Sequence, residues 1–125
     1  LFETRLQAFC PISHYAVGAM VETESGGRFF GCNIEPGGNK GIHAEGVALA
    51  TMVDQEGPRA RISRVTILTG GRPGFPCGGC RQQINEFATE DTEIICMNLE
   101  GEAITSRHSD LLPNSFGRLD LGLED

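Results

Sequence analysis

The pattern of apolar and polar residues divides the first third of the chain into short blocks of helical and strand character. Residues 1–9 carry apolar side chains at positions 2, 6 and 9, a spacing typical of an amphipathic helix. The stretches 15–21 and 28–34 are rich in apolar residues, and a Ser-Gly-Gly turn at 25–27 separates them. These two stretches predict a β-hairpin.

The middle of the chain alternates glycine-rich loops with longer regular blocks. Residues 35–41 and 70–76 are rich in Gly and Pro and predict loops. Residues 43–56 contain apolar side chains at helical spacing, and a Gly-Pro pair stops this helix. Residues 62–69 form a compact β-branched run typical of a strand buried on both faces.

The last third contains one more helix and a pair of strands. A turn at 77–80 opens a helix that the pattern extends over 82–88. Residues 93–98 and 103–105 predict two strands joined by a Glu-Gly turn, and residues 109–112 predict a short helical turn. The order α-β-β-α-β-α-β-β implies a mixed sheet with helices packed on it.

Length and charge narrow the class of protein. The 125 residues suffice for one compact domain, which we expect to span 1–125. The net charge of −7 argues against binding a nucleic acid polymer or an anionic membrane, and favours a small substrate of little charge. Five cysteines, no long apolar run and no signal-like segment predict a reduced, cytoplasmic protein.

Two short motifs carry candidate chemistry, His43-Ala44-Glu45 and Pro76-Cys77-Gly78-Gly79-Cys80. One imidazole and two thiolates suit Zn²⁺ and leave its fourth tetrahedral position open for water. A carboxylate two residues after the histidine is well placed to move protons to and from that water. The motif pair predicts one zinc ion per chain, with His43, Cys77 and Cys80 as its ligands and Glu45 as the proton carrier.

The spacing of the cysteines supports this interpretation. Residues three apart at a helix start place both sulfurs on the same side of the first turn, where the helix dipole lowers the pKa of a thiol. We therefore expect both cysteines to bind as thiolates. His43 completes the ligand set if the start of its helix faces the start of the cysteine helix.

Other interpretations of the cysteine pair are weaker. A redox pair has no use for His-x-Glu, and a structural zinc site needs a fourth protein ligand. The remaining imidazoles, His14 and His108, have no partner motif. A non-catalytic zinc-stabilised or thiol-redox module stays as an alternative from another class, and it predicts that Glu45 is dispensable. Polynucleotide editing is disfavoured by the acidic charge and the lack of aromatic-basic patches.

Five stretches, in order, resemble those of the cytidine deaminase family and together span residues 11–116. The pairing of His-x-Glu with Pro-Cys-x-x-Cys is similar to the signature of zinc-dependent deaminases. The stretches are the two zinc motifs, with Arg81-Gln82 after the second, together with Pro11-Ile12-Ser13-His14-Tyr15-Ala16-Val17-Gly18-Ala19, Gly31-Cys32-Asn33-Ile34-Glu35 and Leu111-Leu112-Pro113-Asn114-Ser115-Phe116.

The resemblance implies a fold and an activity. The fold is a three-layer α/β/α sandwich with a five-stranded mixed sheet. The activity is hydrolytic deamination of cytidine and 2′-deoxycytidine to the uridine products and ammonia, a step of pyrimidine salvage. Short chains of this family usually form homotetramers with active sites at subunit contacts, so we expect a homotetramer, with a dimer as the alternative.

The resemblance also assigns residues around the substrate. Asn33 and Glu35 would hydrogen-bond the sugar hydroxyls, although a polar strand end is the ordinary interpretation of such residues. The ring of Tyr15 would pack against the base or sugar, or else belong to the core. Ala44 would donate its backbone N–H to the pyrimidine carbonyl. Phe116 would lie near the pocket of a neighbouring subunit.

Three positions, Gly46, Pro36 and Phe75, differ from the family pattern, and Gly46 after the Glu is consistent with a ligand set that contains a histidine. Phe75 stands where Ser or Thr is usual, although its carbonyl can still accept from the substrate amine. Pro36 replaces a frequent Asn and precedes an unusual loop at 37–41. Both differences favour, as the alternative substrate, a modified cytosine nucleoside or a nucleoside antibiotic like blasticidin S. Arg81 would hydrogen-bond a cysteine thiolate from outside the ligand set.

Overall fold

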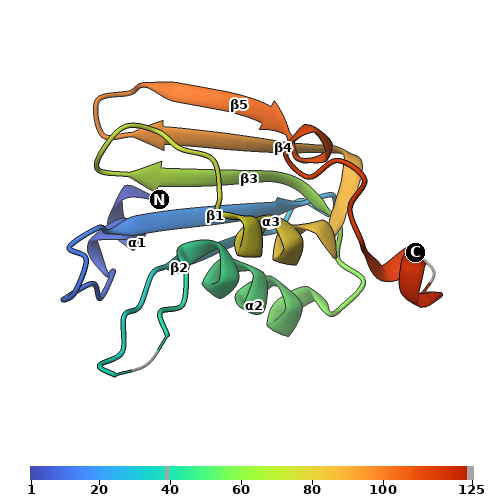
Figure 1. Cartoon of the computed structure of the whole chain (residues 1–125), viewed down its shortest axis with the longest axis horizontal. Helices are drawn as coiled ribbons and strands as arrows, with labels where there is room; N and C mark the ends of the chain where they lie inside the picture. The colour runs from blue at the N-terminus through green and yellow to red at the C-terminus, as the bar shows by residue number, and fades with distance from the viewer. Residues whose placement is uncertain (39, 124–125) are drawn as a thin grey trace.

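The computed structural model describes residues 1–38 and 40–123 of the chain, and residue 39 of the predicted 37–41 loop lies outside them. Its regular elements follow the predicted order (Figure 1). They are α1 (Phe2–Leu6), β1 (Val17–Thr23), β2 (Arg28–Cys32), α2 (Ala44–Glu56), β3 (Ile62–Thr69), α3 (Gly78–Asn85), β4 (Ala88–Asn98), β5 (Ala103–Arg107), α4 (His108–Leu111) and a terminal 3₁₀ turn, η1 (Arg118–Leu121).

The strands form one mixed sheet, as the sequence predicts. Within the described residues it has five strands in the order β2-β1-β3-β4-β5. The β3–β4 pair is parallel, with α3 as its crossover, and the other three pairs are antiparallel. β3 lies in the middle of the sheet, which is covered on both faces, and its side chains from Val65 to Thr69 are all buried. This explains its run of apolar and β-branched residues.

The predicted hairpin of β1 and β2 is confirmed, but β1 begins later than the expected residue 15. Side chains from elsewhere in the chain occupy the carbonyl groups just before the strand. Asn33 donates its amide to the Tyr15 carbonyl oxygen at 2.8 Å, and Arg5 donates from Nε to the Ala16 oxygen at 2.9 Å. Ladder pairing therefore starts at Val17.

The prediction of a helix over residues 82–88 is wrong at its C-terminal end. α3 stops at Asn85, and Ala88 already belongs to β4, five residues before the strand expected at 93. Pairing with β3 causes this, since Ile62 donates to the Phe87 oxygen at 2.9 Å and Thr92 donates from Oγ1 to the Ile62 oxygen at 2.6 Å. Long-range strand pairing overrides the local helical pattern.

Helices cover both faces of the sheet and make the predicted three layers. A side chain at Gly31 would meet the backbone of α2, whereas one at Gly18 would meet Arg5 of α1 on the opposite face. Figure 1 shows α2 and α3 next to each other. Between α2, α3 and the sheet lies the apolar core, which includes Ala19, Ala48, Met52, Val65, Ile67, Ile84 and Ile94.

Candidate active site

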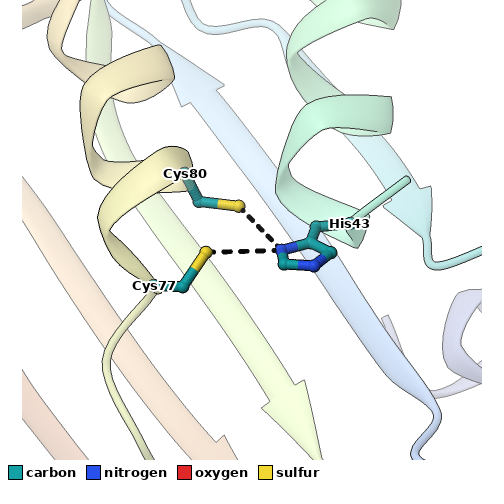
Figure 2. Close-up of side chains that lie close together, drawn as sticks. All are labelled: His43, Cys77 and Cys80. Carbon is teal, nitrogen blue, oxygen red and sulfur yellow. Dashed lines mark hydrogen bonds between the residues drawn. The ribbon is translucent and has the colours of Figure 1, made fainter. Parts of the chain in front are cut away.

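The starts of α2 and α3 face each other and bring the two motifs together. His43 is the N-cap residue of α2, and Cys77 is the N-cap residue of α3. The Nδ1 atom of His43 lies 3.2 Å from Sγ of Cys80 and 3.5 Å from Sγ of Cys77. Figure 2 shows both sulfurs turned toward this nitrogen. The two helix starts therefore face each other, as the ligand set predicted from the sequence requires.

The two sulfurs have different surroundings. Cys77 is exposed, whereas Cys80 is 3% exposed. Burial raises the pKa of the Cys80 thiol well above its ordinary value, and the nearby Glu45 carboxylate and Cys77 raise it further. Burial at Cys80 therefore opposes the lowering of the thiol pKa that the helix dipole favours. A thiol in this position needs a neighbouring cation to ionise.

This donor set fits Zn²⁺. The ligand atoms of His43, Cys77 and Cys80 all lie within 4.8 Å of one another. A tetrahedral zinc ion with bonds of about 2.0 to 2.3 Å places its ligand atoms at such separations. A bound dication also supplies the charge that lets the buried thiol ionise. Three protein ligands leave one coordination position for water.

Glu45 lies beside this triad, in the first turn of α2, and is 6% exposed. Among the described residues, no side chain caps the start of α2 or α3. The first N–H groups of both helices therefore have no intrahelical acceptor and point toward the same region. Ala44, buried in the first turn of α2, has such an N–H group available for a ligand.

A cavity of about 480 Å³ opens next to the triad. Its size is typical of a pocket for a small molecule. Most of the candidate residues line it, namely Tyr15, Asn33, Glu35, His43, Ala44, Glu45, Phe75 and Cys77. Cys80 lies buried behind this wall. The cavity thus joins the predicted metal end to the predicted sugar end.

Glu35 lies at the predicted sugar end of the cavity, where residues 9, 12 and 13 contact it. Its Oε1 accepts hydrogen bonds from the backbone N–H groups of Ile12 at 3.0 Å and Ser13 at 2.9 Å, and its Oε2 accepts one from the Ser13 hydroxyl at 2.5 Å. These bonds, led by the one from the Ser13 side chain, lower the pKa of the Glu35 carboxyl. The carboxylate is therefore held ionised at neutral pH.

Asn33 and Tyr15 belong to the same end of the cavity. The Asn33 side chain bridges the chain before β1, since it donates to the Tyr15 oxygen and accepts from the Val17 N–H at 2.9 Å. Asn33 is 8% exposed, whereas Tyr15 is 47% exposed and lines the cavity. Of the two interpretations of Tyr15, its exposure favours a cavity wall over a core aromatic.

Two candidate residues lie away from the cavity. Arg81 donates from Nε to the Pro76 oxygen at 2.6 Å and from Nη1 to the Leu111 oxygen at 2.9 Å, so it ties the cysteine loop to α4. Phe116 is 59% exposed, and its carbonyl oxygen accepts from Gln82 of α3 at 2.7 Å.

Two polar residues that line the cavity, Ser13 and Thr69, were not singled out from the sequence. Ser13 is the partner of Glu35, and its signal was its place inside a stretch that resembles the family. Thr69 ends β3 and is 3% exposed, and within the described part of the chain its hydroxyl has no hydrogen-bond partner. A single threonine at a strand end carries no signal in the sequence.

Comparison with known proteins places this site in a family. Residues 2–97 match the family model described as cytidine and deoxycytidylate deaminase zinc-binding region. The match covers both zinc motifs and the stretch around Asn33 and Glu35. It is a match over most of the chain rather than over one short motif.

Curated relatives and solved structures agree with this match. A cytidine deaminase of Sporosarcina psychrophila is 33% identical over 120 residues, covering 95% of this chain and 88% of the relative. One of Photobacterium profundum is 38% identical over 92% of this chain, which spans only 37% of that longer relative. The crystal structure of a cytidine deaminase from Burkholderia pseudomallei superposes with a TM-score of 0.85 at 29% identity, covering 92% of each chain.

Proposed function

Since the chain belongs to the cytidine and deoxycytidylate deaminase family, we propose that it catalyses zinc-dependent hydrolytic deamination of cytidine and 2′-deoxycytidine. The products are uridine or 2′-deoxyuridine and ammonia, as in pyrimidine salvage. The observation that carries the proposal is the approach of Nδ1 of His43 to the two cysteine sulfurs at the wall of a cavity that also contains Glu45.

The metal end supplies the reacting groups. His43, Cys77 and Cys80 would hold the zinc ion. When bound, zinc supplies a water molecule whose pKa is lowered toward neutrality. The carboxylate of Glu45 takes a proton from the attacking water and gives it to a ring nitrogen of the pyrimidine. It would then take the second proton from the new hydroxyl on C4 and give it to the amine, which leaves as ammonia while the C4–N bond breaks and the C4 carbonyl forms.

The walls of the cavity orient the base and the sugar. The Ala44 N–H at the start of α2 donates to the pyrimidine carbonyl, and the Phe75 carbonyl accepts from the exocyclic amine. The ring of Tyr15 packs against the nucleoside. Asn33 and Glu35 bind the sugar hydroxyls. All five residues line the same cavity, which supports this assignment.

The charge of the cavity favours a nucleoside over a nucleotide. The family name covers both classes, cytidine and deoxycytidylate. The described residues that line the cavity include the carboxylates Glu35 and Glu45 and no Lys or Arg. A phosphate with about two negative charges would find no cationic partner there and would be repelled by both carboxylates.

Membership of the family supports a proposal for the oligomeric state and for the location in the cell. We infer a single catalytic domain over residues 1–125 that assembles as a homotetramer, in which the exposed Phe116 approaches the cavity of a neighbouring subunit. Arg81 supports the cysteine loop through its bonds to Pro76 and Leu111. None of the described helices has the length and apolar character that crossing a bilayer requires. We propose a cytoplasmic enzyme.

Ultraviolet absorbance tests the activity directly. Purified protein with a measured zinc content is mixed with cytidine, and loss of the cytidine absorbance is followed. We expect turnover at about one zinc per chain. A panel that adds 2′-deoxycytidine, a cytosine nucleotide and modified cytosine nucleosides measures the substrate range. Inert cytidine beside a reactive modified nucleoside would overturn the substrate, and no turnover of any member at full zinc content would overturn the activity.

A further inference from the structure

Thr69 places a buried hydroxyl group on the part of the cavity wall that the sheet forms. It is the last residue of β3, is 3% exposed and lines the cavity. Its neighbours on this face of the sheet are apolar, since Val17 stands opposite it on β1 and Ile67 lies two residues earlier on β3. Thr69 is therefore a single hydroxyl in an apolar stretch of the wall.

Within the described residues, the Oγ1 atom of Thr69 has no hydrogen-bond partner. The polar side chain beside it on β4 is Asn98, and that amide is committed to the turn before β5. Its Nδ2 donates to Oε1 of Glu102 at 2.9 Å, and its Oδ1 accepts from the N–H groups of Glu100 at 3.1 Å and Glu102 at 2.9 Å. Buried hydroxyls are normally hydrogen-bonded, so an unpaired one at a cavity wall points to a ligand group as its partner.

The polar atoms of cytosine already have partners in the proposed mode of binding. The carbonyl oxygen accepts from the Ala44 N–H, N3 receives a proton from Glu45, and the amine on C4 donates to the Phe75 carbonyl. N1 carries the sugar. Only C5 and C6 remain, and in cytosine both carry nothing but hydrogen. The hydroxyl of Thr69 is therefore one polar group more than cytosine itself can use.

A substituent on the ring can supply the partner that cytosine lacks. A group on C6 would crowd the sugar on N1, which leaves C5 as the position. We propose that Thr69 is a specificity residue that forms a hydrogen bond with a polar group on C5 of the pyrimidine, such as a hydroxymethyl group. This inference rests on the proposed function and deepens it, because it states which modified cytosine nucleosides the site prefers.

The consequence is a preference for a polar over an apolar group at C5. The methyl group of 5-methylcytidine leaves the Thr69 hydroxyl buried and unpaired, whereas the hydroxymethyl group of 5-hydroxymethylcytidine pairs with it. We expect kcat/KM of wild type to be about 10-fold or more higher for the hydroxymethyl nucleoside. Thr69→Val keeps the branched shape and removes the hydroxyl, so this ratio should fall to about one. Because the two nucleosides keep their intrinsic reactivities in every variant, the change of the ratio isolates Thr69.

The experiment measures kcat and KM of the zinc-loaded full chain for cytidine, 5-methylcytidine and 5-hydroxymethylcytidine. The variants are Thr69→Val, Thr69→Ser, which keeps a hydroxyl, and Thr66→Val as the matched control. Thr66 is 8% exposed on the same strand, but its side chain lies on the opposite face of the sheet and is not among the described residues that line the cavity. We expect Thr69→Ser to keep most of the preference and Thr66→Val to match wild type. In Thr69→Val, kcat/KM for cytidine should stay within about twofold of wild type.

Thermal unfolding without substrate gives a readout that does not depend on activity. Thr69→Val removes a buried hydroxyl that has no partner in the fold, so its Tm should equal or exceed that of wild type. A clear fall in Tm, absent from Thr66→Val, would show that the hydroxyl is bonded within the fold and would overturn the inference.

The kinetic outcomes separate the inference from the proposed function. If wild type turns over none of the three nucleosides, the proposed function fails. If wild type deaminates cytidine but neither nucleoside with a group on C5, or if Thr69→Val leaves the ratio between these two unchanged, the inference is overturned while the function stands. If Thr69→Val lowers kcat for cytidine as much as for the hydroxymethyl nucleoside, the hydroxyl bonds an atom of cytosine itself, and the inference is likewise overturned.

Discussion

The two ends of the cavity are built by different means. At the metal end, His43 and Cys77 are N-cap residues of α2 and α3, and Glu45 and Cys80 occupy the first turns of the same helices. At the sugar end, Glu35 follows β2 in a loop and is held by residues 22 and 23 positions earlier in the chain. Regular elements packed on the core fix the first set of groups, and long-range hydrogen bonds fix the second.

This difference teaches which changes each end tolerates. Moving a metal ligand requires moving a helix whose inner face is part of the apolar core. Moving the side chain of the half-buried Glu35 requires only the exchange of its three side-chain hydrogen bonds. Defects at the metal end should therefore affect chemistry and folding, whereas defects at the sugar end should affect substrate affinity.

The sharpest test of the metal end is Glu45→Gln. The amide keeps the shape of the side chain but cannot carry the proton, so we expect kcat to fall by roughly 10²- to 10⁴-fold. Zinc content and Tm should stay at the wild-type values, since none of the three ligands changes. Steady-state kinetics with cytidine and parallel metal analysis measure both. Near-native turnover in this variant would refute the role of Glu45 and favour a non-catalytic zinc module.

Removal of a ligand should affect both metal binding and folding. In Cys77→Ala we expect the zinc content to fall well below one per chain and Tm to fall with it, because the free energy of metal binding contributes to folding. Cys10→Ala is the matched control, since Cys10 is a free, half-buried cysteine outside the site. Metal analysis after dialysis and thermal unfolding provide the readouts. Retention of full zinc content would remove Cys77 from the ligand set.

A smaller effect is expected where α2 is seated on the sheet. A Cβ atom at Gly31 would lie 2.4 Å from the Ala48 nitrogen and 2.5 Å from the Ala44 oxygen, so Gly31→Ala must push α2 outward. We expect a loss of about 1 to 3 kcal/mol in the free energy of unfolding, measured with urea. Gly37→Ala is the control, because a Cβ there meets no described atom within 4 Å. Equal stability of the two variants would show that α2 is not fixed by this contact.

The same contrast explains what the sequence could predict. β3 was predicted with its observed bounds. A strand buried on both faces is built mainly from apolar and β-branched residues, and this pattern is visible in the sequence. α3 was extended too far, and β4 was started too late, because pairing of Ala88 with Ile62 depends on a strand distant in the chain. Local patterns identified the elements, and tertiary pairing set several of their ends.

The candidate site follows the same rule. The zinc triad was predictable because its residue types and spacing are dictated by the metal, and each motif is short. The hydrogen bonds between Ser13 and Glu35 were not predictable. The two residues lie 22 positions apart, and any polar residue can end a strand. The unpartnered hydroxyl of Thr69 was likewise invisible, since its burial depends on the packing of the whole sheet.

The smallest expected effect is a pH dependence at the sugar end. Hydrogen bonds from Ser13 lower the pKa of Glu35 below its ordinary value of 4.5, so its contribution to stability is present above that pH and is lost as the pH falls through the lowered pKa. Between about pH 5 and 3 we therefore expect stability to fall more steeply in wild type than in Glu35→Gln. Ser13→Ala should flatten the curve in the same direction. Urea midpoints at several pH values measure the slopes, and the zinc ligands, common to all three proteins, cancel in the comparison. If the urea midpoints of wild type and Glu35→Gln changed with pH in parallel, the bonds between the Glu35 carboxylate and residues 12–13 would not stabilise the folded chain.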